Sequence, residues 1–393
     1  MTLPYGIFST DGSAPRVGVR LDDQILDLAM VGRLGFFDDL GFDRAVFEKP
    51  VLNDFMALGK PVWQAVRQRL LALLTQPEKP LDAFADWVLF PASRATLHLP
   101  MRIGDYTDFY ASEEHATNVG RMFRPQGDPL LPNWKHLPVA YHGRASSIVV
   151  SGTPIKRPAG QFPGPDQQPV FGPSQALDFE LELGIVIGKP SRLGEPVSIA
   201  DAEDHVFGFV LFNDWSARDL QRWEYQPLGP FLGKNFASSV SPWVVPLEAL
   251  DPFRMEGPPQ DPTPLPYLQT TAKRHFDIEL EVVLQPAQSA HAFVISRTNS
   301  RHLYWNVAQL IAHHTVNGCN LNVGDLLATG TISGSTPDSY GSLLELSWNG
   351  TRPLTLPDGS VRTFLEDGDT VTLRGWAGNK QIDWGEVKGR IIA

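Results

Sequence analysis

Asp178–Ile187 reads DFELELGIVI, in which acidic and apolar residues alternate before giving way to a short apolar run. Successive side chains of a strand point to opposite faces, so this alternation predicts a strand with Glu180 and Glu182 on one face. Residues 206–212 form a second apolar run with the length of a buried strand, and Asp214 follows it closely. The two runs predict paired strands with carboxylates near their ends.

The composition extends this picture to the whole chain. Glycine and proline, 34 residues each, make up about 17% of the 393 residues, above the usual share of about 12%. This excess favours many turns and short strands, and predicts a β-rich α+β fold rather than a helical bundle. At roughly 100 to 200 residues per domain, the length predicts two or three domains.

Charge and targeting signals exclude several classes of protein. The formal net charge of −11 lacks the basic footprint of a nucleic-acid binder. A single cysteine, Cys319, forms no internal disulfide and is typical of a reducing compartment. Residues 1–6 have no basic region followed by an apolar stretch, so we expect no signal peptide, and no uncharged apolar run reaches roughly 18 residues. We therefore expect a soluble cytoplasmic protein with no membrane or nucleic-acid partner.

The chain divides near residue 98. Residues 1–98 contain short strand-like pieces and one clear helix at 62–74, whose apolar residues recur at three- and four-residue spacing, with Arg67 and Arg69 on the other face. Chemically useful polar residues become dense only after this point. We therefore expect an accessory domain at 1–98 and a catalytic domain at 99–393, with an ordered Pro/Gly-rich loop at 151–175.

Four carboxylates from separate segments indicate a metal site. Glu180 and Glu182 share a strand face, Asp214 follows the second strand, and Asp108 precedes a short helix. Hard oxygen ligands of this kind are what calcium or magnesium requires. Because no EF-hand spacing is present, the ion would need a cage formed by tertiary structure. The plain alternative is a half-exposed strand with a solvated acidic face.

A candidate proton acceptor lies in the segment Ser112–Gly120. Ser112 is a plausible N-cap, two glutamates follow it, and Gly120 can end the helix. His115 then falls in the first turn, where the positive end of the helix dipole favours a neutral imidazole. The alternative is a capping or surface histidine.

A third constellation follows Asp214. On a short helix Arg218, Gln221 and Tyr225 would lie along one side by the three- and four-residue rule. The alternative is a solvated helix face with an incidental Asp–Arg pair. Lys234 follows a glycine, but the spacing of a phosphate loop is wrong and Asn235 replaces its Ser or Thr, which excludes an NTPase.

Glu345 interrupts the leucine-rich run Leu343–Leu346, which we interpret as a strand. A buried glutamate needs a partner, and His115 is a candidate, because a carboxylate on one ring nitrogen fixes the tautomer whose other nitrogen takes the proton. The alternative is a strand glutamate facing solvent. The Gly-rich segment 330–334 would let backbone amides approach a ligand closely.

At these segments the sequence resembles the fumarylacetoacetate hydrolase family of the full-length type. The likeness covers essentially the whole chain and is densest at residues 103–110, 115–120, 141–147, 213–233 and 330–334. The resemblance implies a small SH3-like barrel at the N-terminus and a larger mixed β-roll domain that forms a homodimer in the cytoplasm.

The resemblance also implies a role for each matching residue. The calcium site would use Asp108, Glu180, Glu182 and Asp214, and a magnesium site would use Asp214, Lys234 and Ser238, where the family usually has Thr. His115 would be the proton acceptor, Glu345 its orienting carboxylate, and Arg218, Gln221 and Lys234 the groups that stabilise negative charge. The substrate would contact Tyr110, Arg124, Tyr141, Gln221, Tyr225 and Thr331.

The implied reaction is metal-dependent hydrolysis of a carbon–carbon bond of 4-fumarylacetoacetate, giving fumarate and acetoacetate at the end of tyrosine and phenylalanine catabolism. Rival interpretations are another acylpyruvate hydrolase, or a hydratase, decarboxylase or isomerase of 2-oxo acids in the same superfamily. A further rival is a non-catalytic calcium-binding protein, in which His115, Glu345 and Arg218 would have no task.

Overall fold

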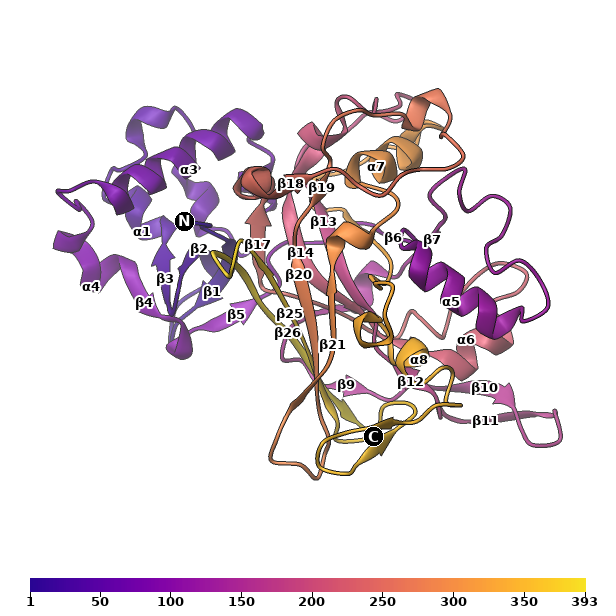
Figure 1. Cartoon of the computed structure of the whole chain (residues 1–393). Coiled ribbons are helices and arrows are strands. Elements are labelled where there is room, and N and C mark those ends of the chain that lie inside the picture. The colour runs from indigo at the N-terminus through magenta and orange to yellow at the C-terminus, as the bar shows by residue number, and fades with distance from the viewer.

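The two apolar runs pair with each other at the centre of the computed structural model, which describes residues 1–393 (Figure 1). They form strands β13 (Leu181–Ile187) and β14 (Val206–Asp214), antiparallel, with Leu181 opposite Asn213 and Ile185 opposite Phe209. Every residue of both strands is buried. Strands covered on both faces read as nearly continuous apolar runs, which explains why the sequence signal is strong here.

These strands belong to a mixed 13-stranded sheet in the order β4-β3-β2-β1-β17-β14-β13-β22-β6-β7, with β5, β16 and β8 attached to its side. Pairs β22–β6 and β16–β8 are parallel and the others antiparallel. The sheet stays open. Its remaining strands are β1 Tyr5–Ser9, β2 Arg16–Leu21, β3 Gln24–Asp27, β4 Leu89–Pro91, β5 Thr96–His98, β6 Tyr106–Phe109, β7 Ala140–His142, β8 Ile148–Val150, β16 Ser238–Val240, β17 Trp243–Pro246 and β22 Leu326–Ala328.

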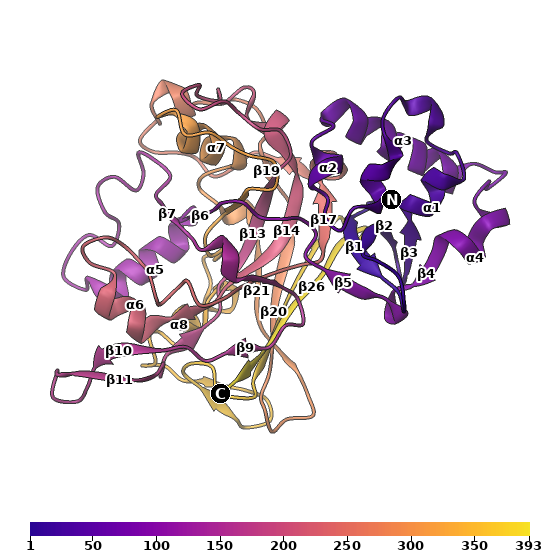
Figure 2. The same cartoon turned by 180° about the vertical axis from the view of Figure 1, so that it is seen from behind.

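A second sheet of five strands, in the order β21-β20-β25-β26-β9, packs against the first (Figure 2). Phe209, Leu280, Leu373 and Trp384 belong to the large apolar core that the two sheets share. The strands of this second sheet are β9 Ile155–Lys156, β20 Glu279–Gln285, β21 Phe293–Asn299, β25 Thr370–Ala377 and β26 Ile382–Ile392. The fold is therefore a sheet-rich α+β fold, as the composition predicts.

Four pairs of short strands complete the β structure. The segment expected to be an ordered loop at 151–175 instead contains a hairpin, β10–β11, that projects from the body (Figures 1 and 2). Its prolines stand at strand ends, which is where a sheet tolerates them. The pairs are β10 Ala159–Pro163 with β11 Pro169–Pro173, β12 Leu177–Asp178 with β15 Ser216–Ala217, β18 Arg254–Met255 with β19 His275–Phe276, and β23 Leu354–Thr355 with β24 Val361–Arg362.

The helices are short, apart from α3, and none is long and apolar enough to cross a membrane. Helix α3 (Lys60–Thr75) confirms the helix expected at 62–74, with its apolar stripe buried. Arg67 corrects that expectation, because it is buried and donates to the carbonyl oxygens of Met1 and Thr2. The other helices are α1 Leu28–Arg33, α2 Asn53–Met56, α4 Ala85–Val88, α5 Glu113–Phe123, α6 Arg218–Glu224, α7 Val307–Thr315 and α8 Leu343–Leu346.

The N-terminal part of the chain continues the main sheet. Strand β1 pairs with β17, with Tyr5 opposite Val244. Tyr5 also belongs to an apolar core that contains Val186 and Phe207 from the central strands, together with residues of α3. Residues 1–98 are thus joined to the rest of the molecule through both a shared sheet and a shared core.

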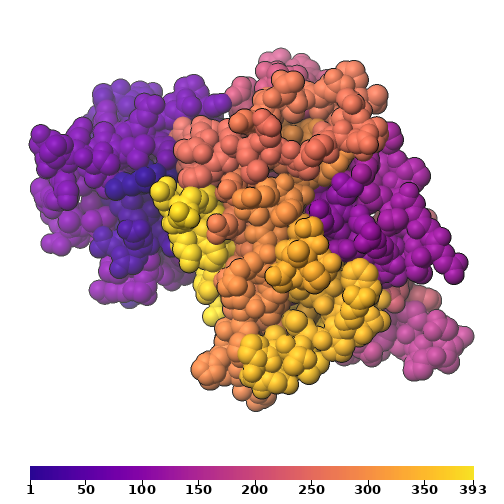
Figure 3. All heavy atoms as spheres, viewed as in Figure 1, coloured from indigo at the N-terminus to yellow at the C-terminus, as the bar shows by residue number.

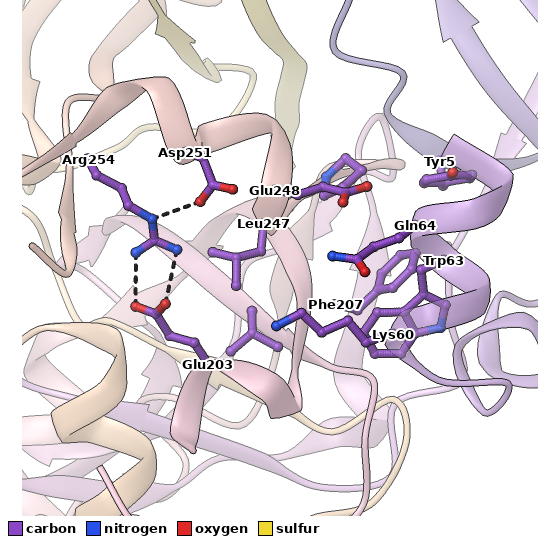
Figure 4. A pocket seen from close by; sticks show the side chains of 12 residues that line it. Tyr5, Lys60, Trp63, Gln64, Glu203, Phe207, Leu247, Glu248, Asp251 and Arg254 are labelled. Carbon is purple, nitrogen blue, oxygen red and sulfur yellow. Dashed lines mark hydrogen bonds and ion pairs between the residues drawn. The ribbon is translucent and has the colours of Figure 1, made fainter. Parts of the chain in front are cut away.

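Charged groups surround this junction. A cavity of about 140 Å³ lies there. Figure 4 shows Lys60 and Trp63 from α3 on one side of it and Arg254 on the other. Arg254 bonds both carboxylate oxygens of Glu203 and also contacts Asp251. In Figure 3 the yellow C-terminal strands lie directly beside the indigo N-terminal residues. Across the junction Lys60 pairs with Asp204 at 2.5 Å and Arg20 with Asp383 at 2.9 Å, so it combines apolar packing with ion pairs.

Candidate active site

Four carboxylates meet at one end of the central strands. Glu180 and Glu182 lie at the start of β13, Asp214 ends the neighbouring β14, and Asp108 lies in β6, with β22 between β6 and β13. Each is at most 4% exposed, and one oxygen from each lies within 4.8 Å of the others. The acidic face predicted from the alternation is therefore buried and convergent, and is not a solvated surface.

The electrostatics of this cluster fit a bound cation. Burial, followed by the charge of Asp214, raises the pKa of Asp108 well above its ordinary value, and burial and Asp108 do the same to the pKa of Glu182. Asp108 Oδ1 and Glu182 Oε1 have no hydrogen-bond partner. Buried carboxylate oxygens without a donor are costly unless a cation satisfies them. Four hard oxygen donors match calcium or magnesium.

Two basic side chains also contact the cluster. Arg218 Nη2 lies 2.7 Å from Glu180 Oε1, and Lys234 Nζ lies 2.7 Å from Asp214 Oδ2 and also contacts Glu180. Burial alone would raise the pKa of Glu180, but the charges of Arg218 and Lys234 outweigh it and lower that pKa. Burial would lower the pKa of Lys234, but Asp214 and Glu180 reverse the effect and raise it. Both cations therefore stay charged beside the cluster.

Asp214 accepts hydrogen bonds from two further candidates. The hydroxyl of Tyr141, in β7, donates to Oδ2 at 2.7 Å, and the hydroxyl of Ser238, in β16, donates to Oδ1 at 3.0 Å. Burial and then the charge of Asp214 raise the pKa of Tyr141 well above its ordinary value, so its phenol stays protonated. The resemblance assigns Lys234 and Ser238, together with Asp214, to a second metal site. Both side chains contact Asp214.

His115 and Glu345 form a buried pair near the acidic cluster. His115 Nδ1 lies 2.7 Å from Glu345 Oε2, and the two residues are 3% and 1% exposed. Ser112 caps helix α5, as predicted, and accepts a hydrogen bond from the His115 backbone N–H. Nδ1 faces the carboxylate, which leaves the other ring nitrogen of His115 without this contact.

The interpretation of the Glu345 segment as a strand is wrong. Leu343–Leu346 is a short helix, α8, because the Ser342 side chain accepts from the Glu345 backbone N–H and starts a helical turn. The expected burial of Glu345 and its pairing with His115 are nevertheless confirmed.

Three polar side chains that the sequence reasoning did not assign complete the surroundings of Glu345. Asn118 donates to Oε1 at 3.0 Å, and the hydroxyls of Ser333 and Ser342 donate to Oε2 at 2.9 and 2.8 Å. Burial would raise the pKa of Glu345, but attraction by His115 and these bonds outweigh it and lower that pKa. The sequence did contain one indication for Asn118. It lies three residues after His115 on the expected helix, so both side chains lie on the same face.

Gly120 does not end helix α5, which continues to Phe123. A Cβ at Gly120 would lie 1.8 Å from the carbonyl oxygen of Pro129. Gly120 therefore allows the chain that follows the helix to pack directly against it.

Besides Tyr141, three of the expected substrate-contacting residues lie next to the groups described above. The ring of Tyr110 packs edge to face with His115 at 5.2 Å between centroids. Thr331 is buried, its hydroxyl has no partner, and the backbone N–H of the preceding Gly330 donates to Glu182 Oε2 at 3.1 Å. The side-chain oxygen of Gln221 accepts from Arg218 Nη1 at 3.3 Å.

Arg124 and Tyr225 lie farther out. Arg124 follows α5, is exposed, and donates to the Pro129 carbonyl at 2.5 Å, while Tyr225 ends α6 and is 43% exposed. Arg124 is still close enough to Tyr110 for its charge to lower the pKa of that phenol, against a larger upward effect of burial. Both side chains therefore lie at the edge of the site and not at its centre.

The geometry brings together an acidic cluster that could hold a cation, a histidine–carboxylate pair and two positively charged side chains. Such an arrangement can bind a polarised oxygen compound, take a proton from water and stabilise a developing anion.

Comparison with known proteins gives a consistent result along the chain. The family model described as fumarylacetoacetate (FAA) hydrolase C-terminal matches residues 105–391, and the model described as fumarylacetoacetase N-terminal matches residues 1–100. The chain is 50% identical over 397 residues to a fumarylacetoacetase of Rattus norvegicus, covering 99% of this chain and 95% of that one. It is 52% identical over 401 residues to one of Dictyostelium discoideum, covering 99% and 94%.

Solved structures share the fold at lower identity. A fumarylacetoacetate hydrolase from Exiguobacterium antarcticum has a TM-score of 0.57 at 19% identity, covering 100% of this chain and 99% of that one. A 5-carboxymethyl-2-hydroxymuconate delta-isomerase from Mycobacterium smegmatis has a TM-score of 0.52 at 18% identity, covering 99% of each chain. At these identities the likeness establishes the fold alone.

Proposed function

The chain belongs to the fumarylacetoacetate hydrolase family, and from that premise we propose that it hydrolyses 4-fumarylacetoacetate to fumarate and acetoacetate, the last step of tyrosine and phenylalanine catabolism. One observation above all supports this function. The buried His115–Glu345 pair adjoins the acidic cluster, because the backbone of Ser342 pairs with that of Glu180 while its hydroxyl donates to Glu345. A base would therefore lie beside a cation site.

Asp108, Glu180, Glu182 and Asp214 would hold a divalent ion, which we propose to be calcium. The second site that the resemblance implies, for magnesium at Asp214, Lys234 and Ser238, would offer ligand oxygens from Asp214 and Ser238 only, because the charged Lys234 ammonium has no lone pair to donate. When bound, a divalent ion supplies Lewis acidity toward the oxygens of a 1,3-diketone. The unpartnered oxygens of Asp108 and Glu182 are the structural feature that fits it.

His115 would take a proton from the attacking water. Glu345 holds the imidazole through Nδ1, so the other nitrogen acts as the base, and a positioned base typically contributes about 10²- to 10⁴-fold in rate. The water oxygen adds to one carbonyl carbon of the diketone. The carbon–carbon bond then breaks, and its electron pair leaves on the other half as an enolate, which a proton converts to acetoacetate.

Arg218, Gln221 and Lys234 would stabilise the negative charge that develops. Arg218 and Lys234 stay charged beside the cluster, and Gln221 contacts the guanidinium of Arg218. Fixed donors in a water-poor site are effective because they need no reorganisation during the reaction. The substrate would also contact Tyr110, Arg124, Tyr141, Tyr225 and Thr331.

A second candidate function is hydrolysis of another acylpyruvate, or the hydration or decarboxylation of a 2-oxo acid. The fold alone does not separate these reactions, because a solved 5-carboxymethyl-2-hydroxymuconate delta-isomerase shares it. Product analysis distinguishes the two candidate functions. Only the proposed hydrolase releases one fumarate and one acetoacetate for each molecule of substrate consumed.

We further propose a cytoplasmic homodimer in which residues 1–98 form an SH3-like accessory domain and residues 99–393 the catalytic β-roll. Exposed apolar side chains near helix α6 and on the β10–β11 hairpin support the dimer, among them Phe171, Leu228 and Phe231. Light scattering on the purified protein tests it, with the mass of two chains as the expected result and 43.5 kDa as the contrary one.

The function is tested by incubating the purified protein with fumarylacetoacetate and two simpler acylpyruvates, with and without chelator. We expect fumarate and acetoacetate in equal amounts, and loss of turnover when the ion is removed. His115→Ala should abolish turnover while leaving calorimetric metal affinity nearly intact. Unchanged turnover in that variant would show that His115 is not the base.

A further inference from the structure

Asp178 is a buried carboxylate that touches two separate parts of the proposed site without belonging to the acidic cluster. It ends strand β12 and is 0% exposed. Its Oδ2 accepts from Arg218 Nε at 2.8 Å. Its Oδ1 accepts from the Leu343 backbone N–H at 2.7 Å, and Oδ2 from the Leu344 N–H at 3.1 Å. Leu343 and Leu344 are the first two residues of α8, the helix that carries Glu345.

The carboxylate of Asp178 therefore binds both the guanidinium of Arg218 and the start of helix α8 at the end of strand β12. Arg218 makes its other contacts through its Nη atoms, to Glu180 and Gln221, so the Nε bond to Asp178 fixes the plane of the guanidinium. The two N–H groups at the start of α8 have no intrahelical partner and need an acceptor. The carboxylate oxygens of Asp178 accept from both of them.

We propose that Asp178 is a positioning residue that sets the placement of Arg218 relative to the His115–Glu345 pair. This inference rests on the proposed hydrolase function, in which Arg218 stabilises the leaving enolate while His115 activates water. Both groups must be in place within one catalytic cycle, His115 for the addition of water and Arg218 for the cleavage that follows, and a displacement of about 1 Å commonly costs about 10²-fold in rate.

The contacts show why aspartate is required. Both oxygens act as acceptors, so the NH₂ group of an amide would face an N–H donor in either orientation. In the Oδ2 position it would face Arg218 Nε and the Leu344 N–H, and in the Oδ1 position the Leu343 N–H. Asp178→Asn keeps the shape and introduces that conflict. Asp178→Glu keeps the charge but lengthens the side chain by one methylene, which displaces the carboxylate from both partners.

The N-terminal part of the chain offers a matched control. Asp27 is also 0% exposed, pairs with an arginine through Arg16 Nε at 2.5 Å, and caps helix α1 by accepting from the Met30 N–H at 3.1 Å. Asp27→Asn loses the same kinds of contact outside the catalytic groups. A general loss of stability affects both variants, whereas misplacement of Arg218 and Glu345 affects only the Asp178 variants.

The experiment compares steady-state kinetics and crystal structures of the wild type and the three variants. We expect kcat to fall about 10- to 100-fold in Asp178→Asn and Asp178→Glu with a much smaller change in KM, and to stay within about twofold in Asp27→Asn. Crystals of Asp178→Glu should show Arg218 or α8 displaced.

Wild-type kcat in folded Asp178→Glu, or unmoved Arg218 and α8 in its crystal, would overturn the inference. An equal fall of kcat in Asp27→Asn would overturn it as well, because it would indicate a general structural effect. A wild-type protein that does not hydrolyse fumarylacetoacetate rejects the proposed function instead, and the crystal comparison then still decides whether Asp178 positions both groups.

Discussion

At the scale of single residues, the proposed active site consists of buried polar groups that depend on one another. Glu345 has donors on both oxygens, from His115, Asn118, Ser333 and Ser342. Loss of one partner leaves a buried charge underbonded, which costs more than the bond contributes when intact. The same cost applies to Asp108 Oδ1 and Glu182 Oε1, which have no hydrogen-bond partner unless a cation binds.

The lowered pKa of Glu345 predicts a pH-dependent contribution to stability. The folded state favours its ionised form, so this contribution is fully present above the ordinary pKa of 4.5 and is lost as the pH falls through the lower folded value. Glu345→Gln removes it. We expect denaturation midpoints of wild type and variant to differ most near neutral pH and to converge in acid. A difference that stays constant or grows in acid would contradict this assignment.

At the scale of elements, the position of α5 decides where His115 lies. The helix packs against the chain that follows it at Gly120, where no Cβ fits, and α8 brings Glu345 to its other side. The sequence predicted α5 from its cap and first turn. It could not reveal α8, because a four-residue helix has no periodic pattern and Leu343–Leu346 reads equally well as a strand.

Gly120→Ala tests this packing. The added methyl group would collide with the Pro129 carbonyl, so α5 or the following chain must move, at a cost of about 1–3 kcal/mol in stability with a fall in kcat. Gly127→Ala is the matched control, because nothing lies within 4 Å of a Cβ there. Melting temperatures and kinetics of the two variants should differ clearly. Equal behaviour would show that the close approach at Gly120 is unimportant.

At the scale of the whole molecule, the two central strands and the candidate residues could be identified from sequence, because β13 and β14 read as apolar runs and His115 follows a capping serine. The convergence of the four carboxylates and the pairing of Glu345 with His115 depend on contacts between distant segments, so the sequence also left a solvated acidic face and a solvent-facing glutamate open. The joining of residues 1–98 to the main sheet was not accessible, since β1 meets β17 across more than 200 residues of chain. Asp178 was missed for a similar reason, because its partners come from α6 and α8.

This shared sheet and core predict that the chain unfolds as one unit. Phe207 packs against the rings of Tyr5, Phe55 and Trp63, so it links the central strands to the N-terminal part. Calorimetry should show a single transition, which Phe207→Ala moves to lower temperature as a whole, with a loss of about 3–5 kcal/mol. Two separate transitions, only one of them shifted by the substitution, would contradict the prediction.

The most direct test of the account is a calorimetric titration of calcium and magnesium into metal-free protein. We predict saturable binding to the wild type, weakened at least about tenfold by Asp108→Asn and unchanged by Asp27→Asn, which alters a buried aspartate outside the cluster. Absence of binding in the wild type, or equal affinity in Asp108→Asn, would contradict the claim that the four buried carboxylates form a cation site.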